Sequence, residues 1–567
     1  MAASKQRTSS ARGKQTGHKQ TGSGGATGST AGRKPPKAAS PSARAEHEPP
    51  VPGGFADLYD AGHAQVVSAT RVADLETPVS AYMKLSSPGR MSFLLESVEG
   101  GSIRGRYSII GLDPDLVWRA HGNQAEINRS AATTPDAFEP EPTDTLTSLR
   151  QLLSESRIDL PDDLPTALPP MVAGIFGYMG YDTVRLVEHL PNCPPDALGV
   201  PDAVLMRPTV MVIFDTVKDE ITVVTPVRPI DGVDAETAYA EAHARLASVA
   251  SALDAPMPPS HLANQADDAE ALVAAGEPVS NTSPAKYLDM VQQAKDYIAA
   301  GDAFQIVLSQ RFTLPFHLPP FALYRALRRT NPSPFLFFLN FNEFALVGSS
   351  PEILVRARDS EVTIRPIAGT ARRGASARED QLLAEQLLAD PKERAEHLML
   401  LDLGRNDVGR VAEIGSVSVT DKFIIERYSH VMHIVSNVIG RLRGDLDAID
   451  ALMAGFPAGT VSGAPKVRAM EIIDELEVHK RGPYAGCVGY FSADGNMDTC
   501  IVLRTALVKD GEMHVQAGAG LVYDSVPENE QQECINKAKA LVRAADEAVR
   551  FAGGKPADPG ANKGAWS

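Results

Sequence analysis

The feature that most constrains the fold is a series of short strand-like runs that recurs through the 567-residue chain and alternates with helical patterns. Apolar runs of roughly four to eight residues, some with every second residue polar, are typical of strands with one or both faces buried. In the first half the strand-like runs are 92–95, 106–111, 204–214 and 221–227, and the helical patterns are 145–156 and 234–253. This mixture predicts an α+β fold and not a helical bundle.

The second half repeats the mixture with longer helical patterns. Its strand-like runs are 305–308, 335–340, 344–348, 362–366, 485–491, 499–508 and 513–518, and its helical patterns are 378–408, 430–439, 445–454, 465–476 and 528–551. A further helix is predicted at 283–300, because Ser283 and Pro284 fit an N-cap followed by proline at the first helical position. Gly301 fits the position just after the end of that helix.

Two segments without apolar periodicity divide the chain. Residues 2–50 contain no Leu, Ile, Val, Phe, Tyr or Trp, so they cannot bury enough surface to offset the entropy of ordering. A transit peptide is an alternative for this basic tail, but such peptides are amphipathic and this one has no apolar face. We therefore expect a disordered basic tail at 1–50, an α+β domain at 51–254, a linker at 255–284, a second domain at 285–552 and a disordered C-terminal tail at 553–567.

Charge and cysteine content limit the partners. The formal net charge of -16 disfavours nucleic acid and anionic membranes, because such partners need clustered positive charge. Four cysteines lie far apart without the short spacings of a zinc site, which fits free thiols in a reducing compartment. No apolar run reaches the roughly 18 residues that span a bilayer. We expect a cytoplasmic protein that binds neither nucleic acid nor membrane.

Two acidic pairs with the same spacing stand on predicted helices. Glu393 and Glu396 are three residues apart, and so are Glu530 and Glu533. Residues three apart share one helix face and can converge on one ligand. A single such pair is more often a solvated face. Together the four carboxylates offer the oxygen ligands that Mg²⁺ takes.

Two segments rich in small residues can hold an anion or approach a ligand. Residues 456–466 are dense in Gly, Ser, Thr and Pro and precede a predicted helix, so their backbone N–H groups can face an anion. A helix-entry turn without a ligand is equally consistent with this composition. Residues 516–520 end a predicted strand with two glycines, which permit close backbone approach, although a bulge is the simpler explanation.

These segments, in this order, resemble the chorismate-binding enzymes and, among them, the members that form anthranilate. The matching stretches are 348–352, 365–370, 396–407, 428–433, 457–466, 481–486, 498–504 and 516–533. The resemblance extends from about Phe55 to Arg550. It implies the fold of that family, with mixed, mostly antiparallel sheets layered with helices in two associated subdomains. The domain at 51–254 would be regulatory and the domain at 285–552 would bind chorismate and carry catalysis.

The resemblance also implies a metal site and a substrate site. Mg²⁺ would bind Glu396 and Glu533, with Glu393 and Glu530 holding its waters. Chorismate would contact residues that share small size or a hydrogen-bond donor, namely Gly369, Thr370, Tyr484, Arg504, Gly518, Ala519 and Gly520. This division fits the substrate, because one carboxylate of the chorismate dianion can bridge to the metal while Arg504 binds the other.

The implied reaction joins ammonia to chorismate and releases pyruvate, giving anthranilate. Hydroxide is a poor leaving group, so a general acid is required, and Glu352 matches the family residue. His433 would act in the elimination step with Thr460 nearby, although a lone helical histidine is otherwise a packing or surface residue. Two positions would specify the nucleophile. Sister enzymes that form aminodeoxychorismate have a lysine at Ala368, and those that form isochorismate or salicylate have one at Gln305; packing is the alternative at both positions.

Regulation and partners follow from the same resemblance. A feedback pocket for tryptophan would contain Glu96, Ser97, Pro334, Phe335 and Leu336, although two core strands would also explain these residues. No cysteine lies in a recognisable glutamine-hydrolysing motif, so ammonia would come from free ammonium or from a glutamine amidotransferase subunit (component II) in a heterotetramer. The alternatives are an aminodeoxychorismate synthase and a non-catalytic tryptophan-sensing or scaffold subunit.

Overall fold

The computed structural model describes residues 51–99, 103–158, 171–258, 277–428 and 431–552. The predicted tails at 1–50 and 553–567, and most of the predicted linker, lie outside these residues. In the first half the elements are α1 (Gly53–Asp60), β1 (Gln65–Val72), α2 (Pro78–Leu85), β2 (Ser92–Glu99), β3 (Ile103–His121), β4 (Gln124–Asn128), β5 (Glu139–Pro140), α3 (Thr145–Glu155), β6 (Gly174–Met179), the 3₁₀ helix η1 (Tyr181–Leu186), β7 (Ala203–Asp215), β8 (Glu220–Val227) and α4 (Ala235–Asp254).

The second half contains more strands than the sequence predicted. Its elements are β9 (Val279–Ser280), α6 (Pro284–Ala300), β10 (Gln305–Pro315), α7 (Pro320–Thr330), β11 (Phe335–Asn340), β12 (Phe344–Ser350), β13 (Ile353–Arg358), β14 (Glu361–Ile364), β15 (Ile367–Arg372), α8 (Ala377–Ala389), α9 (Pro391–Gly409), β16 (Ser418–Arg427), β17 (Val431–Arg441), α10 (Ala448–Gly455), α11 (Gly459–Ser462), β18 (Gly463–Ala464), α12 (Lys466–Leu476), β19 (Cys487–Ser492), β20 (Met497–Ile501), β21 (Thr505–Lys509), β22 (Glu512–Leu521) and α13 (Pro527–Phe551).

Antiparallel pairing joins the strands of both halves into one branched sheet. The strand β2 pairs with β11, and β6 pairs with β19, so two separate ladders connect the first half of the chain to the second. The long strand β7 pairs with β3, β6 and β8 and is one of the strands at which the sheet branches. The predicted α+β class with mostly antiparallel strands is confirmed.

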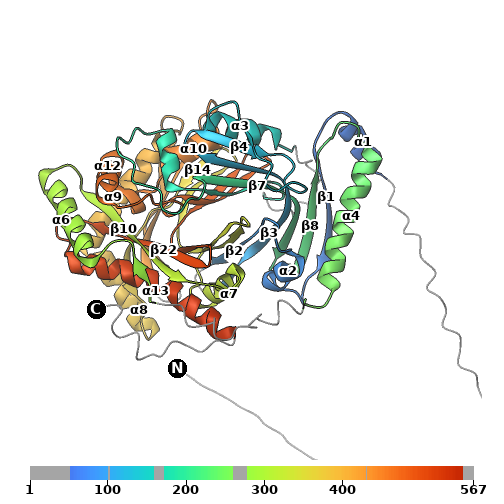
Figure 1. Cartoon of the computed structure of the whole chain (residues 1–567). Helices are drawn as coiled ribbons and strands as arrows, with labels where there is room; N and C mark the ends of the chain where they lie inside the picture. Colours follow the sequence, from blue (N-terminus) through green and yellow to red (C-terminus); the bar gives the residue numbers. More distant parts are fainter. Residues whose placement is uncertain (1–50, 100–102, 159–170, 259–276, 429–430, 553–567) are drawn as a thin grey trace, which may run out of the picture. The chain divides into compact units, whose positions relative to one another are not determined.

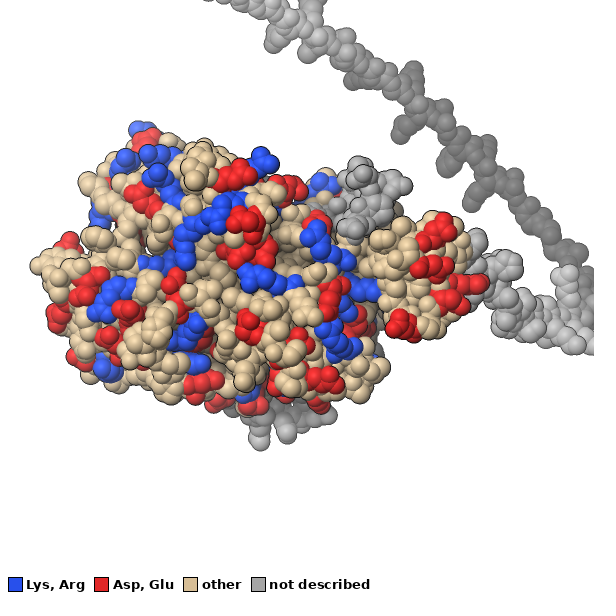
Figure 2. Space-filling view, turned by 90° about the horizontal axis from the view of Figure 1, so that it is seen from above, with Lys and Arg blue, Asp and Glu red and all other residues tan. Residues whose placement is uncertain are grey.

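Helices cover the sheet on the sides that carry apolar residues. In Figure 1 the helix α4 lies along β1 and β8, and α13 runs beside β22 and β10. The helices α9 and α10 pack on the strands β13, β14, β15 and β17. Over the face in Figure 2, Lys and Arg side chains alternate with Asp and Glu across most of the surface. None of the helices in the described residues is long and apolar enough to cross a membrane.

The residues at the two ends of α6 correctly predicted where this helix begins and ends. The side chain of Ser283 accepts a hydrogen bond from the backbone N–H of Lys286 and caps α6. The helix ends at Gly301, whose φ of 90° is left-handed and strained for residues with a Cβ. Both signals act within one turn, so no tertiary contact is needed to predict them.

Three predicted elements differ from the structure. The helix predicted at 430–439 is wrong, because residues 431–441 form β17, whose β-branched side chains are buried between β14, β15 and β16. The helix predicted at 378–408 is two helices, since Asp390 ends α8 and its side chain caps α9. The strand predicted at 499–508 is two strands, which Arg504 interrupts with a φ of 48°.

The shared sheet predicts that neither half of the chain folds alone. A fragment ending at Pro258 leaves β2 without β11 and β6 without β19, so one edge of each strand is unpaired, and a fragment beginning at Glu277 exposes the edges of β11 and β19. Each fragment should lack a cooperative thermal transition in calorimetry, whereas the two expressed together should recover one. A cooperative transition in either fragment alone would contradict this dependence.

Candidate active site

Glu352 lies directly after β12 and is removed from water. Only 6% of this residue is exposed. Its carboxylate accepts a hydrogen bond of 3.2 Å from the Thr460 hydroxyl and another from the backbone N–H of Ile367. Burial outweighs these bonds and raises the pKa of Glu352 from 4.5 to about 8. At neutral pH the group is therefore a protonated acid that can give up a proton.

His433 lies on β17 opposite Thr370 on β15. Its Nδ1 is 3.0 Å from the carbonyl oxygen of Gly369 and 3.1 Å from the Thr370 hydroxyl. Because a carbonyl can only accept, Nδ1 carries the proton and Nε2 is the basic nitrogen. Burial lowers the pKa of His433, which keeps the ring neutral and able to accept a proton.

Glycines allow close approach at the three positions where the sequence suggested a ligand-facing backbone. At Gly369, whose φ is 72°, a Cβ would lie 3.0 Å from a carboxylate oxygen of Glu393. At Gly518 a Cβ would lie 2.8 Å from the Tyr484 hydroxyl, and at Gly520 it would lie 3.0 Å from the Gln305 amide nitrogen. Larger residues at these positions would displace the side chains that line the site.

The two acidic pairs lie on α9 and α13, and each pair repels itself. Partial burial and the neighbouring Glu396 raise the pKa of Glu393. Burial, opposed by a hydrogen bond from Ser525 and reinforced by Glu533, raises the pKa of Glu530. These shifts mean that ionisation of Glu393 and Glu530 is less favourable than in water unless positive charge is added nearby.

Two side chains engage the predicted metal ligands. The Gln305 amide nitrogen donates to Glu396 over 3.1 Å. The Lys537 ammonium donates to Glu533 and to the carbonyl oxygen of Gly518, each over 2.8 Å. The sequence analysis missed Lys537, although its position four residues after Glu533 on one helix was the available signal.

The oxygen atoms of the two acidic pairs and of Gln305 are of the kind that a hard divalent cation binds. The available ligands are carboxylate oxygens that repel one another, and the buried amide oxygen of Gln305 has no hydrogen-bond partner among the described residues. In those same residues no group of three or more His, Cys, Asp or Glu side chains stands in metal-binding geometry. A cation here would therefore take Glu533 from Lys537 and Glu396 from Gln305.

The predicted substrate donors are available for an anion. Burial lowers the pKa of Arg504, and this guanidinium forms no ion pair with the residues that the structure describes. Burial raises the pKa of Tyr484, so its hydroxyl stays protonated and can donate. A buried guanidinium without a carboxylate partner among the described residues is suited to an anionic ligand, and the phenol whose charge acts on it is that of Tyr428.

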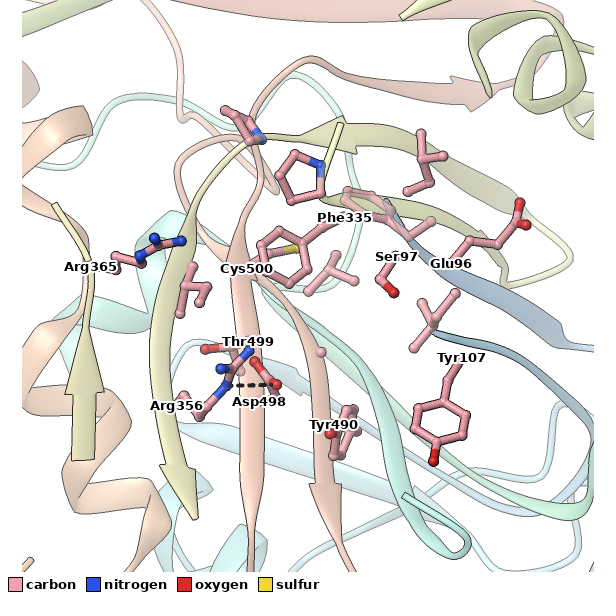
Figure 3. A pocket seen from close by; sticks show the side chains of 18 of the residues that line it. Glu96, Ser97, Tyr107, Phe335, Arg356, Arg365, Tyr490, Asp498, Thr499 and Cys500 are labelled. Atoms are coloured by element: carbon pink, nitrogen blue, oxygen red, sulfur yellow. Dashed lines mark hydrogen bonds and ion pairs between the residues drawn. The ribbon is translucent and has the colours of Figure 1, made fainter. Parts of the chain in front are cut away.

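A cavity of about 830 Å³, here called the inhibitor cavity, is lined by all five residues that were predicted to bind an inhibitor. Ser97 and Phe335 are direct neighbours across β2 and β11 (Figure 3). The Glu96 carboxylate is held by Arg328 and Tyr324, so its role is to support this wall. Pro334 and Leu336 complete the same side of the cavity.

One short segment separates the inhibitor cavity from Glu352. Pro351 and Ile353 line the cavity, whereas Glu352 between them bonds to Thr460 on the other side. The cavity also reaches Tyr428, whose ring is 5.5 Å from that of His433. Tyr428 donates to Glu426 over 2.9 Å, and Glu426 pairs with Arg365. The sequence analysis assigned no role to these three residues, although two lie in stretches it had singled out.

Comparison with known proteins identifies the class. The family described as chorismate binding enzyme matches residues 93–543, so the chain belongs to the chorismate binding enzymes. Within this family it is similar to anthranilate synthase component 1 of Cereibacter sphaeroides, with 58% identity over 87% of this chain and 97% of that protein. It is also similar to the proteins of that name from Pseudomonas aeruginosa (49% identity, 84% and 94% covered) and Thermus thermophilus (47%, 84% and 97%).

Solved structures agree with this grouping. The crystal structure of anthranilate synthase component I from Streptococcus pneumoniae matches with a TM-score of 0.66 and 38% identity, covering 83% of this chain and 99% of that one. The menaquinone-specific isochorismate synthase of Escherichia coli matches with a TM-score of 0.62 at 20% identity, which shows a common fold alone.

The burial of Glu352 predicts a stability effect that depends on pH. Since the folded-state pKa is raised, folding becomes costlier as pH rises from 4.5 towards 8, by about 1.4 kcal/mol per pH unit and by about 3 kcal/mol at pH 7. Glu352→Gln removes this cost, so urea unfolding should show the variant gaining stability over the unsubstituted protein between pH 5 and pH 7. Glu343→Gln, at an exposed position, is the control. A pH-independent difference for Glu352→Gln would show that the carboxyl is not buried as described.

Proposed function

We propose that this protein converts chorismate and ammonia to anthranilate and pyruvate for tryptophan biosynthesis. Membership of the chorismate binding enzymes supports an enzyme that acts on chorismate. The observation that carries the proposal is the buried, protonated Glu352 beside Thr460, in a site where Arg504 is unpaired by any described residue. This combination supports proton donation to a leaving group on an anionic substrate.

The substrate would be held from two sides. Arg504, the Tyr484 hydroxyl and the backbone near Gly518 would bind one carboxylate. Mg²⁺ held by Glu396 and Glu533, with Glu393 and Glu530 on its waters, would supply the positive charge for the other carboxylate. The Glu396 and Glu533 side chains would leave Gln305 and Lys537 to do so.

Proton transfers would fall to two residues. Glu352 would protonate the departing ring hydroxyl so that it leaves as water while ammonia bonds to the ring. Nε2 of His433 would then accept the ring proton while the bond from the ring to the enolpyruvyl oxygen breaks and the ring becomes aromatic. The group would leave as the enolate of pyruvate, which is protonated at carbon, and the added ammonium group would return a proton to Glu352. The Nδ1–H bond of His433 to Gly369 fixes the orientation of the imidazole for the elimination step.

The choice of nucleophile follows from two side chains. Ala368 on β15 has no amine, so it cannot attack the ring as a lysine would. The Gln305 amide donates to Glu396 and has no basic lone pair, so it cannot activate water. Both features favour free ammonia as the nucleophile.

Ammonia would come from a second subunit. The relatives are named component 1, which implies a further component. Burial raises the pKa of Cys487, Cys500 and Cys534, so these thiols are poor nucleophiles for glutamine hydrolysis. We therefore expect a glutamine amidotransferase partner in a cytoplasmic heterotetramer.

Tryptophan would inhibit by occupying the inhibitor cavity. Phe335, Tyr107 and Tyr490 offer apolar and aromatic surface for an indole (Figure 3). Asp498 is bound by Arg356 and Arg358 through one oxygen, and its other oxygen is buried without a partner among the described residues, which suits an ammonium group. Because Pro351 and Ile353 line the cavity, a bound ligand that displaced either residue would also move Glu352 between them. We therefore propose that tryptophan inhibits by displacing this acid.

The activity predicts a defined pair of products. With chorismate, ammonium and Mg²⁺, the protein should release anthranilate and pyruvate in equal amounts, measured by fluorescence and a coupled lactate dehydrogenase assay. Glu352→Gln should lower kcat by roughly 10²–10⁴-fold, whereas Glu343→Gln should not. Glu396→Gln should weaken Mg²⁺ binding in calorimetry. An aminated product without pyruvate would favour an aminodeoxychorismate synthase, and absent turnover would favour a binding subunit.

The inhibitor cavity predicts a separable regulatory phenotype. Ser97→Leu fills the cavity wall beside Phe335, so the tryptophan concentration for half inhibition should rise by about tenfold or more, while uninhibited kcat stays within about twofold. Ser68→Leu, on β1 away from the cavity, is the control. Unchanged tryptophan sensitivity of the Ser97 variant would contradict the assignment.

A further inference from the structure

Arg481 is among the most deeply buried charged residues of the described structure, and it is held on every side. Only 2% of this residue is exposed. Its guanidinium donates twice to Glu477, over 2.7 and 3.0 Å, and once each to the backbone oxygens of Val461 and Val307, both over 2.7 Å. No part of it is free to contact substrate, so any role in the reaction must act through its neighbours.

Those neighbours carry three of the residues assigned to the active site. Val461 directly follows Thr460, whose hydroxyl bonds to Glu352. Val307 lies two residues after Gln305 on β10. The guanidinium also lies 5.6 Å from the ring centre of Tyr484. One planar group thus contacts three parts of the site. These are α11, which carries Thr460, β10, which begins at Gln305, and the ring of Tyr484.

The carboxylate partner of Arg481 is itself fixed. Glu477 accepts hydrogen bonds of 2.8 Å from both the backbone N–H and the hydroxyl of Ser309 on β10. Gln516 on β22 donates to the same Ser309 hydroxyl over 2.8 Å. Because Arg481, Glu477 and Ser309 are buried and hydrogen-bonded one to the next, the guanidinium has little freedom to shift.

We propose that Arg481 is a positioning residue that sets where Thr460, Gln305 and Tyr484 stand relative to Glu352. The inference rests on the proposed function for the roles of these residues. Only a planar guanidinium presents donors in several fixed directions at once, and an ammonium at the same position cannot span the two carbonyls and both carboxylate oxygens. The effect on catalysis passes through the bond from Thr460 to Glu352.

Loss of the hydrogen bond from Thr460 should shift the pKa of Glu352 in one direction. The Thr460 hydroxyl lowers the pKa of Glu352 against the larger, opposite effect of burial. If the short helix α11, which carries Thr460, loosens, the pKa of Glu352 rises further, and the acid stays protonated to a higher pH. A purely structural role of Arg481 would lower stability without moving this titration.

The test compares Arg481→Lys, Thr460→Val and the double variant. The first readout is the pH at which Glu352 ionises in the folded state, taken from the stability difference between each protein and its Glu352→Gln counterpart. Both single variants should raise that pH by about half to one unit, and the double variant should raise it no further than Thr460→Val does. This readout needs no turnover, so it stands even if the proposed function fails.

The second readout is the pH dependence of chorismate turnover with ammonium. Arg481→Lys should lower kcat by about tenfold with KM changed by less than about twofold, and its basic limb should move upward with that of Thr460→Val. Arg207→Lys, which replaces another bidentate arginine bonded to Asp115, is the matched control and should leave the profile unchanged.

If Arg481→Lys does not fold, Arg481→Met with Glu477→Gln removes both charges and keeps the acceptor for Ser309. An unmoved titration, or effects that add in the double variant, would overturn the proposal.

Discussion

The hydrogen-bond ladders between β2 and β11 and between β6 and β19 are the constraint on which the rest of the structure depends. They place strands from opposite ends of the chain side by side, so Ser97, Phe335 and Ser350 lie in register across three strands. Glu352 follows two residues later. Ser97 on the cavity wall is therefore far from Glu352 in sequence, while only a few strands of the sheet lie between them.

The candidate site contains both acidic pairs and a buried arginine. Within each acidic pair, Glu396 disfavours ionisation of Glu393 and Glu533 disfavours ionisation of Glu530, whereas the buried Arg504 forms no ion pair with a described carboxylate. A chain with a net charge of -16 can bind a dianion only where such local cations outweigh the general field. The arrangement suits a substrate with two separated negative groups better than one with a single charge.

The sequence predicted what local chemistry determines and failed where distant partners decide. The caps at Ser283 and Gly301 acted within one helical turn and were predicted correctly. The segment at 430–439 was predicted as a helix because its apolar spacing fits both periods, and only the pairing of residues 431–441 with three other strands makes this segment β17. In the candidate site, residue types such as glycine and glutamate indicated the chemistry. The contacts of Arg481 with Val307 and of Tyr428 with the cavity required the folded structure, whereas the pairing of Lys537 with Glu533 could have been predicted from their spacing of four residues.

The wall formed by Pro351, Glu352 and Ile353 has a consequence for how the protein can change over generations. Pro351 and Ile353 line the inhibitor cavity, whereas Glu352 between them bonds to Thr460 on α11. Under the proposed function, a substitution that tunes end-product sensitivity at this wall would also affect catalysis. Variation in sensitivity should therefore accumulate at the far side of the cavity, around Tyr107 and Tyr490, while the shared segment is held nearly constant by the need to keep both tasks at once.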